Sequence, residues 1–256
     1  FFDKAIQMGA DFVATGHYAR VAKTTQEKLQ TASYQLKAGY DNNKDQSYFL
    51  WTLTQKELSK TLFPVGHLKK DGVRKLAKKF GLPTAEKKDS QGLCFIGKVD
   101  FRDFLRHFVK EKIGKILDES GKIIGKHDGA FFYTIGQRHG FLITKKTPND
   151  SPYFIIKKNI KKNILVVSQK KPENSFLANS KLTQIKDVNW ISRAPDLGKI
   201  YFARIRYRQP LQKCRVIMTK KKTAKVEFDL PQQAITSGQS LVIYDKDVCL
   251  GGGIIE

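Results

Sequence analysis

Short, regularly spaced strands fill about the last third of this 256-residue chain and limit its fold more than any other feature. From about residue 178 onward, apolar and polar side chains alternate in short runs that are separated by turn-forming residues. Examples are "IYFARIRYRQ", "KCRVIMTK", "TAKVEFD" and "SLVIYD". Because alternation places every second side chain on the same face of a strand, such a series can bury one face throughout. The pattern predicts a small antiparallel barrel or sandwich.

The opening of the chain has the pattern of an α/β sheet instead. "FFDKAIQMG" predicts a short helix over residues 3–9, and the mostly apolar "DFVATGH" that follows is typical of a buried parallel strand. Ligands in open α/β sheets gather beyond the carboxyl ends of such strands, so Gly16 and His17 would lie at a binding edge. A turn glycine and a structural histidine are alternative interpretations of the same two residues.

Further strands and helices are predicted before residue 90. "YARV" and "ASYQLKAGY" alternate as strands do, and "KDQSYFLWTL" has a polar opening and a dense aromatic run that predicts the start of a helix. Thr54 and Glu57 form a capping-box pattern. "LKKDGVRKLAKKFGLP" predicts an amphipathic helix with Asp71 as its N-cap and a Gly-Leu-Pro stop.

The middle of the sequence predicts a small mixed region. "VDFRDFLRHFVKEKI" is an amphipathic helix pattern with Asp100 placed to cap it, and "GKILDESGKIIGKHDG" predicts a hairpin. "GAFFYTIGQRHGF" predicts a short helix, and "YFIIKK" and "NILVVSQ" are two more strand patterns. With 256 residues the chain is long enough for two or three domains.

Positive charge dominates the composition. Lys and Arg total 47 against 24 Asp and Glu, which gives a net charge of +23. Such a balance favours a polyanionic partner, although an AT-rich genome that fills surface positions with lysine would produce the same excess. No run of 18 apolar residues and no export leader is present, so the sequence predicts no membrane partner. Phe1 begins inside a helix pattern, which predicts that an upstream part is absent.

Three cysteines, Cys94, Cys214 and Cys249, lie far apart without a C-x-x-C pair. This spacing indicates neither a secreted disulfide framework nor a structural zinc site, and it favours a reducing cytosolic setting. The histidines have no metal-binding spacing either, so no metal site is predicted. Cys214 and Cys249 lie in strand patterns, where cysteine usually acts as a small buried apolar residue.

Cys94 lies in "KKDSQGLCFIGK", a glycine-flanked segment that is typical of a loop. A cysteine attacks as its thiolate, and only about 3% of an ordinary thiol is ionised at pH 7. The nearby Lys87, Lys88 and Lys98 would favour the thiolate, whereas Asp89 would oppose it. From these residues alone, a reactive and an inert Cys94 are equally well supported.

The segment "RIRYRQ" is the best local candidate for binding nucleic acid. In a strand, Arg204, Arg206 and Arg208 would share one face, and Ile205 and Tyr207 would take the other. A row of guanidinium groups could then follow the phosphates of a nucleic acid. A solvated barrel face explains the same pattern nearly as well.

Taken together, these stretches closely resemble one family, the MnmA-type tRNA-specific 2-thiouridylases of the PP-loop ATP-pyrophosphatase group. The resemblance spans nearly the whole chain in family order. It rests on "GADFVATGHYAR", "KDQSYFL", "FPVGHLKKDGVRKLAKKFGLPTAEKKDSQGLCFIG", "FYTIGQRHG", "RIRYRQ", "SGQSLVIYD" and "CLGGGII".

The resemblance implies an α/β plus β fold in three parts. These are the C-terminal end of a PP-loop nucleotide-binding domain over residues 1–98, a small central α+β domain over 99–172 and a C-terminal antiparallel β-barrel over 178–256. It also implies a cytoplasmic enzyme that uses ATP, with Mg²⁺, to adenylate the C2 oxygen of the wobble uridine in tRNA before sulfur replaces that oxygen. A cysteine desulfurase or a sulfur-relay protein would supply the sulfur.

The resemblance also implies roles for individual residues. Cys94, in the family's D-S-x-G-x-C-F-I-G motif, would carry the sulfur as a persulfide, and Gly16 would contact ATP through its backbone. The remaining matches would contact tRNA; they are His17, Lys44, Asp45, Gln46, Arg206, Tyr207 and Gln239.

One departure from the family pattern stands out. The phosphate-binding S-G-G-x-D-S loop and the first catalytic cysteine, which would release sulfur by forming a disulfide with Cys94, would both precede Phe1. We therefore expect residues 1–256 alone to be inactive. Two alternatives stay open, namely a non-catalytic RNA-binding protein and another PP-loop enzyme that modifies RNA.

Overall fold

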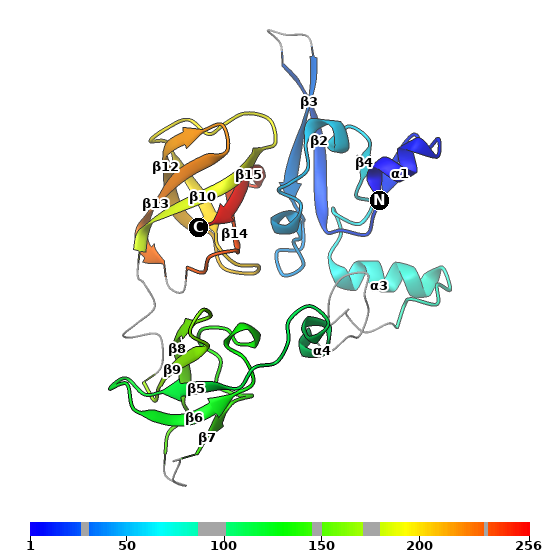
Figure 1. Ribbon diagram of the computed structural model, residues 1–256. Coiled ribbons are helices and arrows are strands. Elements are labelled where there is room, and N and C mark those ends of the chain that lie inside the picture. Colours follow the sequence, from blue (N-terminus) through cyan, green and yellow to red (C-terminus); the bar gives the residue numbers. More distant parts are fainter. Residues whose placement is uncertain (27–30, 87–100, 145–149, 171–179, 233–234) are drawn as a thin grey trace. The chain divides into compact units, whose positions relative to one another are not determined.

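The computed structural model describes residues 1–26, 31–86, 101–144, 150–170, 180–232 and 235–256. The chain divides into two compact units (Figure 1). The first unit combines Phe1–Lys87 with Asn179–Glu256, and the second is Lys88–Ala178. No helix in the described ranges is long and apolar enough to cross a membrane.

Six antiparallel strands at the end of the chain form the predicted barrel, drawn from yellow to red in Figure 1. They pair in the order β10-β13-β12-β11-β14-β15, and β10 also pairs with β15, which closes the ring. Apolar side chains such as Ile185, Val216 and Leu241 are fully buried inside it, as the alternation predicts. The strands are β10 (Ser180–Trp190), β11 (Ile200–Arg204), β12 (Gln212–Lys220), β13 (Thr223–Gln232), β14 (Ser240–Asp245) and β15 (Val248–Ile255).

A hairpin from the start of the chain extends this barrel sheet. Its strands are β2 (Ala19–Gln26) and β3 (Thr31–Ala38), and β3 pairs with β15 through Leu36 and Cys249. The first and last segments of the chain therefore share one eight-stranded sheet. The domain limits at 98–99 and 172–178 stay predictions, since the compact units group the chain by contact and not by order along it.

Short elements complete the first unit. They are α1 (Phe2–Gln7), β1 (Val13–Ala14), the 3₁₀ helix η1 (Ser47–Phe49), α2 (Gln55–Leu58), β4 (Thr61–Leu62) and α3 (Lys70–Lys79). β1 and β4 are parallel, as the sequence predicts for β1. The capping box of Thr54 and Glu57 is confirmed at the start of α2. "KDQSYFLWTL" forms only the single turn η1.

The predicted N-cap of α3 is wrong. Lys69 occupies the N-cap position, and Asp71 lies in the first turn. The side chain that satisfies the helix start is Asp41, whose Oδ2 accepts a hydrogen bond from the backbone N–H of Lys70 at 2.9 Å. A residue from the loop after β3 therefore acts as the cap, which ties that loop to α3.

The second unit is a five-stranded sheet of order β7-β6-β5-β9-β8. Its core includes Ile116, Ile155 and Leu165, all fully buried. The predicted hairpin and strands are confirmed, but α4 ends at Arg106 and not near residue 113, and Glu111 beyond the helix forms an ion pair with Arg106. Asp100 lies outside the described residues. The elements are α4 (Phe101–Arg106), β5 (Gly114–Leu117), β6 (Ile123–His127), η2 (Ala130–Phe132), β7 (Leu142–Ile143), β8 (Phe154–Asn159) and β9 (Ile164–Ser168).

Candidate nucleic-acid interface

Lys44, Asp45 and Gln46 form a tight turn whose polar side chains mostly point inward. Asp45 is only 3% exposed, and its Oδ1 accepts hydrogen bonds from the backbone N–H groups of Gly39 and Ser47, both at 3.0 Å. Gln46 binds Tyr18 twice, because its Oε1 accepts from the Tyr18 N–H and its own N–H donates to the Tyr18 carbonyl. These bonds fix the turn before the aromatic run begins.

The aromatic run attaches this turn to the barrel. The Tyr48 hydroxyl donates to the Ser240 carbonyl at 2.8 Å, and the Trp51 indole N–H donates to Ser240 Oγ at 3.0 Å. Ser47 Oγ lies 3.1 Å from the Tyr244 hydroxyl. Tyr48, Trp51 and Tyr244 are buried in one apolar cluster with strands of the barrel sheet. The segment 44–51 is therefore packed onto β14, the strand that starts at Ser240.

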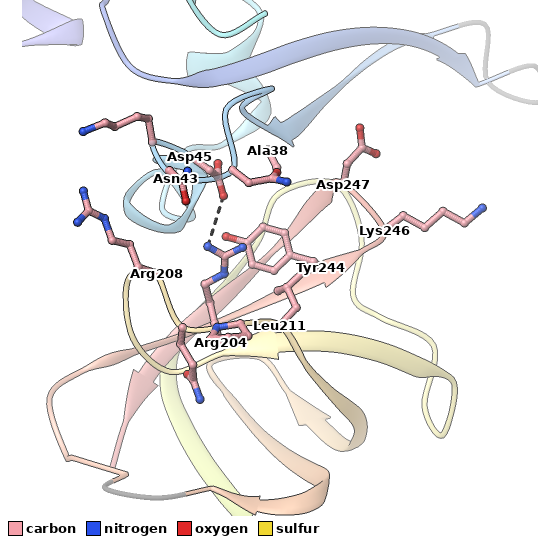
Figure 2. Close-up of a pocket in the computed structure, with 13 residues that line it drawn as sticks. Ala38, Asn43, Asp45, Arg204, Arg208, Leu211, Tyr244, Lys246 and Asp247 are labelled. Carbon is pink, nitrogen blue, oxygen red and sulfur yellow. Dashed lines mark ion pairs between the residues drawn. The ribbon is translucent and has the colours of Figure 1, made fainter. Parts of the chain in front are cut away.

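A buried ion pair joins the same turn to the end of β11. Arg204 Nη1 lies 3.5 Å from Asp45 Oδ2, and the two side chains are 11% and 3% exposed (Figure 2). The Arg204 guanidinium also lies 5.0 Å from the centroid of the Tyr244 ring. Among the described residues, Asp45 Oδ2 and Arg204 Nε have no hydrogen-bond partner, so charge attraction holds this contact and hydrogen bonding does not.

A pocket of about 640 Å³ opens beside this pair, as Figure 2 shows. Four basic and two acidic side chains contribute to its wall, and both acidic groups have basic partners: Asp45 has Arg204, and Asp247 has Arg20 and Lys37. The pocket wall thus carries a net positive charge, which suits an anion. Its lining is Ala38, Asn42, Asn43, Lys44, Asp45, Arg204, Arg208, Gln209, Pro210, Leu211, Tyr244, Lys246 and Asp247.

The predicted row of three arginines along a strand is wrong. β11 ends at Arg204, and the chain then turns, with Arg208 at a φ of 63°. The turn forms because Gln209 Oε1 accepts a hydrogen bond from the Ile205 N–H at 2.8 Å while the Gln209 N–H donates to the Arg206 carbonyl. Arg204 therefore points inward, whereas Arg206 and Arg208 are exposed on a loop.

The exposed loop meets the segment 44–51 through aromatic rings. The centroids of Phe49 and Tyr207 lie 4.6 Å apart, and those of Tyr48 and Tyr207 lie 6.3 Å apart. The Arg208 guanidinium lies 5.3 Å from the centre of the Tyr207 ring. Two segments that lie far apart in the sequence thus form one basic and aromatic surface.

Gly16 and His17 follow β1 and precede Tyr18, which binds Gln46. Gly16 is exposed, and a Cβ added there would meet no atom of the described residues within 4 Å. His17 Nδ1 lies 2.9 Å from Thr15 Oγ1, and burial lowers the pKa of His17 below its ordinary value. Its neutral ring is thus favoured near pH 7.

The remaining candidate site residues are Gln239 and the cysteines. Gln239 directly precedes Ser240, and among the described residues its buried Oε1 has no hydrogen-bond partner. Cys94 lies outside the described residues. Cys214 and Cys249 are buried, as predicted, and burial raises the pKa of each thiol to about 12. Within the described ranges, no group of three or more His, Cys, Asp or Glu side chains could hold a metal ion.

Sequence reasoning missed several residues of this surface, above all Phe49, Ser240 and Tyr244. Phe49 is hidden in an aromatic run whose pattern is typical of a core. Ser240 carries a weak signal, because it is a polar residue at the start of the otherwise apolar strand pattern "SLVIYD". Its hydroxyl accepts a hydrogen bond from the Trp51 indole N–H, which explains a polar side chain at that position.

The first segment and the closed β-barrel together form a basic, aromatic surface that suits a nucleic acid. The comparisons agree with a protein that modifies RNA. Three family models cover the chain: a tRNA methyl transferase HUP domain at residues 1–98, a tRNA methyl transferase PRC-barrel domain at 102–169 and an aminomethyltransferase beta-barrel domain at 180–255.

Curated relatives then specify the family. The tRNA-specific 2-thiouridylases MnmA of Nitrosomonas eutropha and Geobacillus thermodenitrificans are each 45% identical over 257 aligned residues, which include 100% of this chain and 69% and 66% of those proteins. That of Buchnera aphidicola is 44% identical and is covered over 68% of its length. The chain spans about two thirds of the length of these relatives. It belongs to the MnmA family of tRNA-specific 2-thiouridylases.

Proposed function

We propose that the protein is a tRNA sulfur transferase that replaces the C2 oxygen of the wobble uridine by sulfur. The observation that carries this proposal is the meeting of the segment 44–51 with the arginine loop on one basic and aromatic surface, within a chain of this family. A polyanion with exposed bases is the substrate class that such a surface suits.

In this proposal, ATP is held beside Gly16. The glycine lies two residues beyond a strand of a parallel pair, and the space beside its backbone is open, so its surroundings fit a ligand that approaches the main chain. Bound ATP would supply the adenylyl group that converts the C2 oxygen into part of a leaving group. We place Mg²⁺ with the nucleotide phosphates, because Mg²⁺ commonly binds substrate phosphates and few protein ligands.

The surface described above would hold the tRNA. Some residues of this surface would contact the RNA, and others would shape the turn that carries them. Lys44, Arg206 and Tyr207 would touch the RNA together with His17. The buried Asp45 and the half-buried Gln46, whose side chains are bound to backbone groups, would shape the turn that presents them. Gln239 belongs to the same neighbourhood through Ser240. The side-chain oxygens of Asp45 and Gln46 already accept hydrogen bonds from backbone N–H groups, and this use of their side chains is the basis of the division.

Cys94 is proposed as the carrier of the incoming sulfur. The two other cysteines are poor candidates, because their thiols stay protonated at neutral pH and are buried. A cysteine desulfurase or a sulfur-relay protein would load Cys94, and we expect the cytoplasm to be the site of the reaction. The boundaries 1–98, 99–172 and 178–256 complete the proposal.

The test uses the complete natural protein that contains this chain, with tRNA, ATP and a sulfur donor. We expect Cys94→Ser to abolish 2-thiouridine, measured by mass spectrometry of digested tRNA, and to leave tRNA binding unchanged. Cys214→Ala is the matched control and should keep thiolation. Thiolation by the Cys94→Ser protein would contradict the role of Cys94, and absence of thiolation by the unaltered protein would contradict the proposed function.

Alkylation separates the enzyme from a non-catalytic RNA-binding protein. With limiting iodoacetamide at neutral pH, a sulfur carrier should be labelled at Cys94 well before Cys214 and Cys249, which should react only after unfolding. Slow labelling of all three thiols, with RNA affinity unchanged, would favour the RNA-binding alternative.

A further inference from the structure

Phe49 is the most unusual side chain on the surface just described. It is 54% exposed, although its neighbours Tyr48 and Trp51 in the same aromatic run are buried. Single exposed apolar side chains are common and need no explanation on their own. What sets Phe49 apart is that its backbone and its ring are both held in place.

The backbone of Phe49 is fixed by η1, in which its N–H donates to the Gln46 carbonyl at 3.0 Å. Its ring is fixed by two others. Tyr48 meets it edge-on, with centroids 5.4 Å apart, and Tyr207 lies 4.6 Å away at 47°. Tyr48 is itself anchored to Ser240 of the barrel. The protein therefore presents a pre-positioned aromatic ring to solvent, which reduces the entropy lost when a ligand stacks on it.

Positive charge lies next to the two tyrosines that support this ring. Arg208 lies over Tyr207, and both Arg204 and Arg206 are near enough to Tyr48 for their charges to oppose the rise that burial causes in the pKa of its hydroxyl. Arg206 and Arg208 are exposed, and Lys44 lies in the pocket wall with Arg208. An aromatic ring with cations on its flank is the arrangement that binds single-stranded nucleic acid, because the base stacks and the phosphates meet the charges.

We propose that Phe49 is a stacking platform for one unpaired base of an RNA ligand, with Tyr48 and Tyr207 as its supports and Arg206 and Arg208 as contacts to the neighbouring phosphates. Only an unpaired base has a free face to offer, so the platform selects single strands and loops over duplex. Charge complementarity favours RNA over a protein partner, since the chain carries a net charge of +23. This inference rests on the proposed function only for the source of the RNA.

The test measures binding of the 256-residue chain to a labelled uridine-rich RNA heptamer by fluorescence anisotropy, with the same strand annealed to its complement as the duplex. We expect Phe49→Leu to weaken single-strand binding by about 5- to 150-fold, the range found when a base-stacking ring is removed. Duplex binding should change by less than about twofold, since no unpaired base is then lost. Phe49→Trp should bind the heptamer at least as well as the unaltered chain.

Salt dependence separates stacking from charge. Phe49→Leu should leave the slope of log Kd against log salt unchanged, whereas Arg206→Ala should lower that slope by about 0.7 for the single strand, because one phosphate contact is lost. Phe131→Leu is the matched control: this phenylalanine is 44% exposed in the second unit. Its substitution should leave the affinity unaltered.

Three results would overturn the proposal. The first is an unchanged heptamer affinity of Phe49→Leu, which would mean that the ring contacts a protein partner instead. The second is a loss of heptamer affinity in Phe49→Trp as large as that in Phe49→Leu. The third is a loss of duplex affinity in Phe49→Leu as large as its loss of heptamer affinity. Because Phe49 is mostly exposed, we expect the variants to fold, and circular dichroism checks this. If the chain gives the expected binding results but the complete protein does not thiolate tRNA, the stacking role of Phe49 stands and the proposed function is rejected. The reverse outcome would reject this inference alone.

Discussion

Two segments of the candidate interface use their polar residues in opposite ways. In segment 44–51, Asp45 and Gln46 point inward and bind the backbone of their own unit. In the loop after β11, Arg206 and Arg208 point outward, and only Arg204 reaches back to Asp45. The residues of one interface thus divide into those that build its shape and those that stay exposed to solvent. Burial separates the two groups where residue type does not.

Replacing Asp45 by alanine should have the largest effect on the stability of the first unit. It removes the acceptor of two backbone N–H groups and leaves Arg204 buried without its partner, so we expect unfolding to become easier by about 3 to 5 kcal/mol. Both tryptophans, Trp51 and Trp190, lie in the first unit, so tryptophan fluorescence during urea unfolding reports on that unit.

Asp247→Ala is the matched control. Asp247 lines the same pocket, but its side chain is 43% exposed and its pairs with Arg20 and Lys37 lie at the surface. Surface pairs contribute about 1 kcal/mol or less. If both substitutions lowered the free energy of unfolding by the same small amount, Asp45 would not be one of the residues that build the shape of the interface.

Removing the Ser240 hydroxyl should have an intermediate effect. Ser240→Ala takes away the acceptor of the Trp51 indole N–H but keeps the backbone carbonyl that binds Tyr48, so one of the two hydrogen bonds between Ser240 and segment 44–51 is lost. We expect a loss of about 1 to 3 kcal/mol, the cost of leaving a buried donor unpaired. The measurement is again urea unfolding followed by tryptophan fluorescence.

Ser237→Ala serves as the control for this change, since Ser237 is exposed in the turn before Gln239. It should alter stability by no more than about 0.5 kcal/mol. A Ser240→Ala chain as stable as the control would show that the Trp51 bond does not hold the segment, and segment 44–51 would then depend on its remaining contacts to the barrel strands.

Local patterns in the sequence predicted most of the strands but not the way distant segments meet. Alternation located the barrel strands, and the spacing of Thr54 and Glu57 predicted a cap that the structure confirms. The pairing of β3 with β15 joins residues at opposite ends of the chain, so no local pattern can reveal it.

The errors have the same origin. Arg204 alternates with Ile205 as a strand residue would. The strand nevertheless ends at Arg204, because the side-chain amide of Gln209 accepts a hydrogen bond from Ile205 in the turn that follows, and the Arg204 side chain pairs with the buried Asp45. Asp71 has the right residue type for an N-cap, but Asp41 reaches that helix start from another loop. The resemblance named the segments of the candidate surface, whereas their inward or outward direction depends on tertiary contacts.

The smallest effect is expected at His17. It precedes Tyr18, whose backbone is hydrogen-bonded to Gln46. Burial lowers the pKa of His17, so the unfolded chain, with an ordinary value of about 6.5, binds a proton more readily than the folded one. The first unit should therefore be fully stabilised above pH 6.5 and lose part of its stability as the pH falls below that value. In His17→Gln this part of the pH dependence should disappear.

The readout for His17 is the urea midpoint reported by tryptophan fluorescence between about pH 5.5 and 7.5, compared between the unaltered chain and His17→Gln. His127, whose pKa burial also lowers, lies in the second unit and does not contribute to the tryptophan signal of the first. A midpoint that rose on acidification would mean that the charged ring is favoured in the folded state. His17 would then face an acidic group and would belong with the residues that build the interface, and its proposed contact with RNA would be rejected.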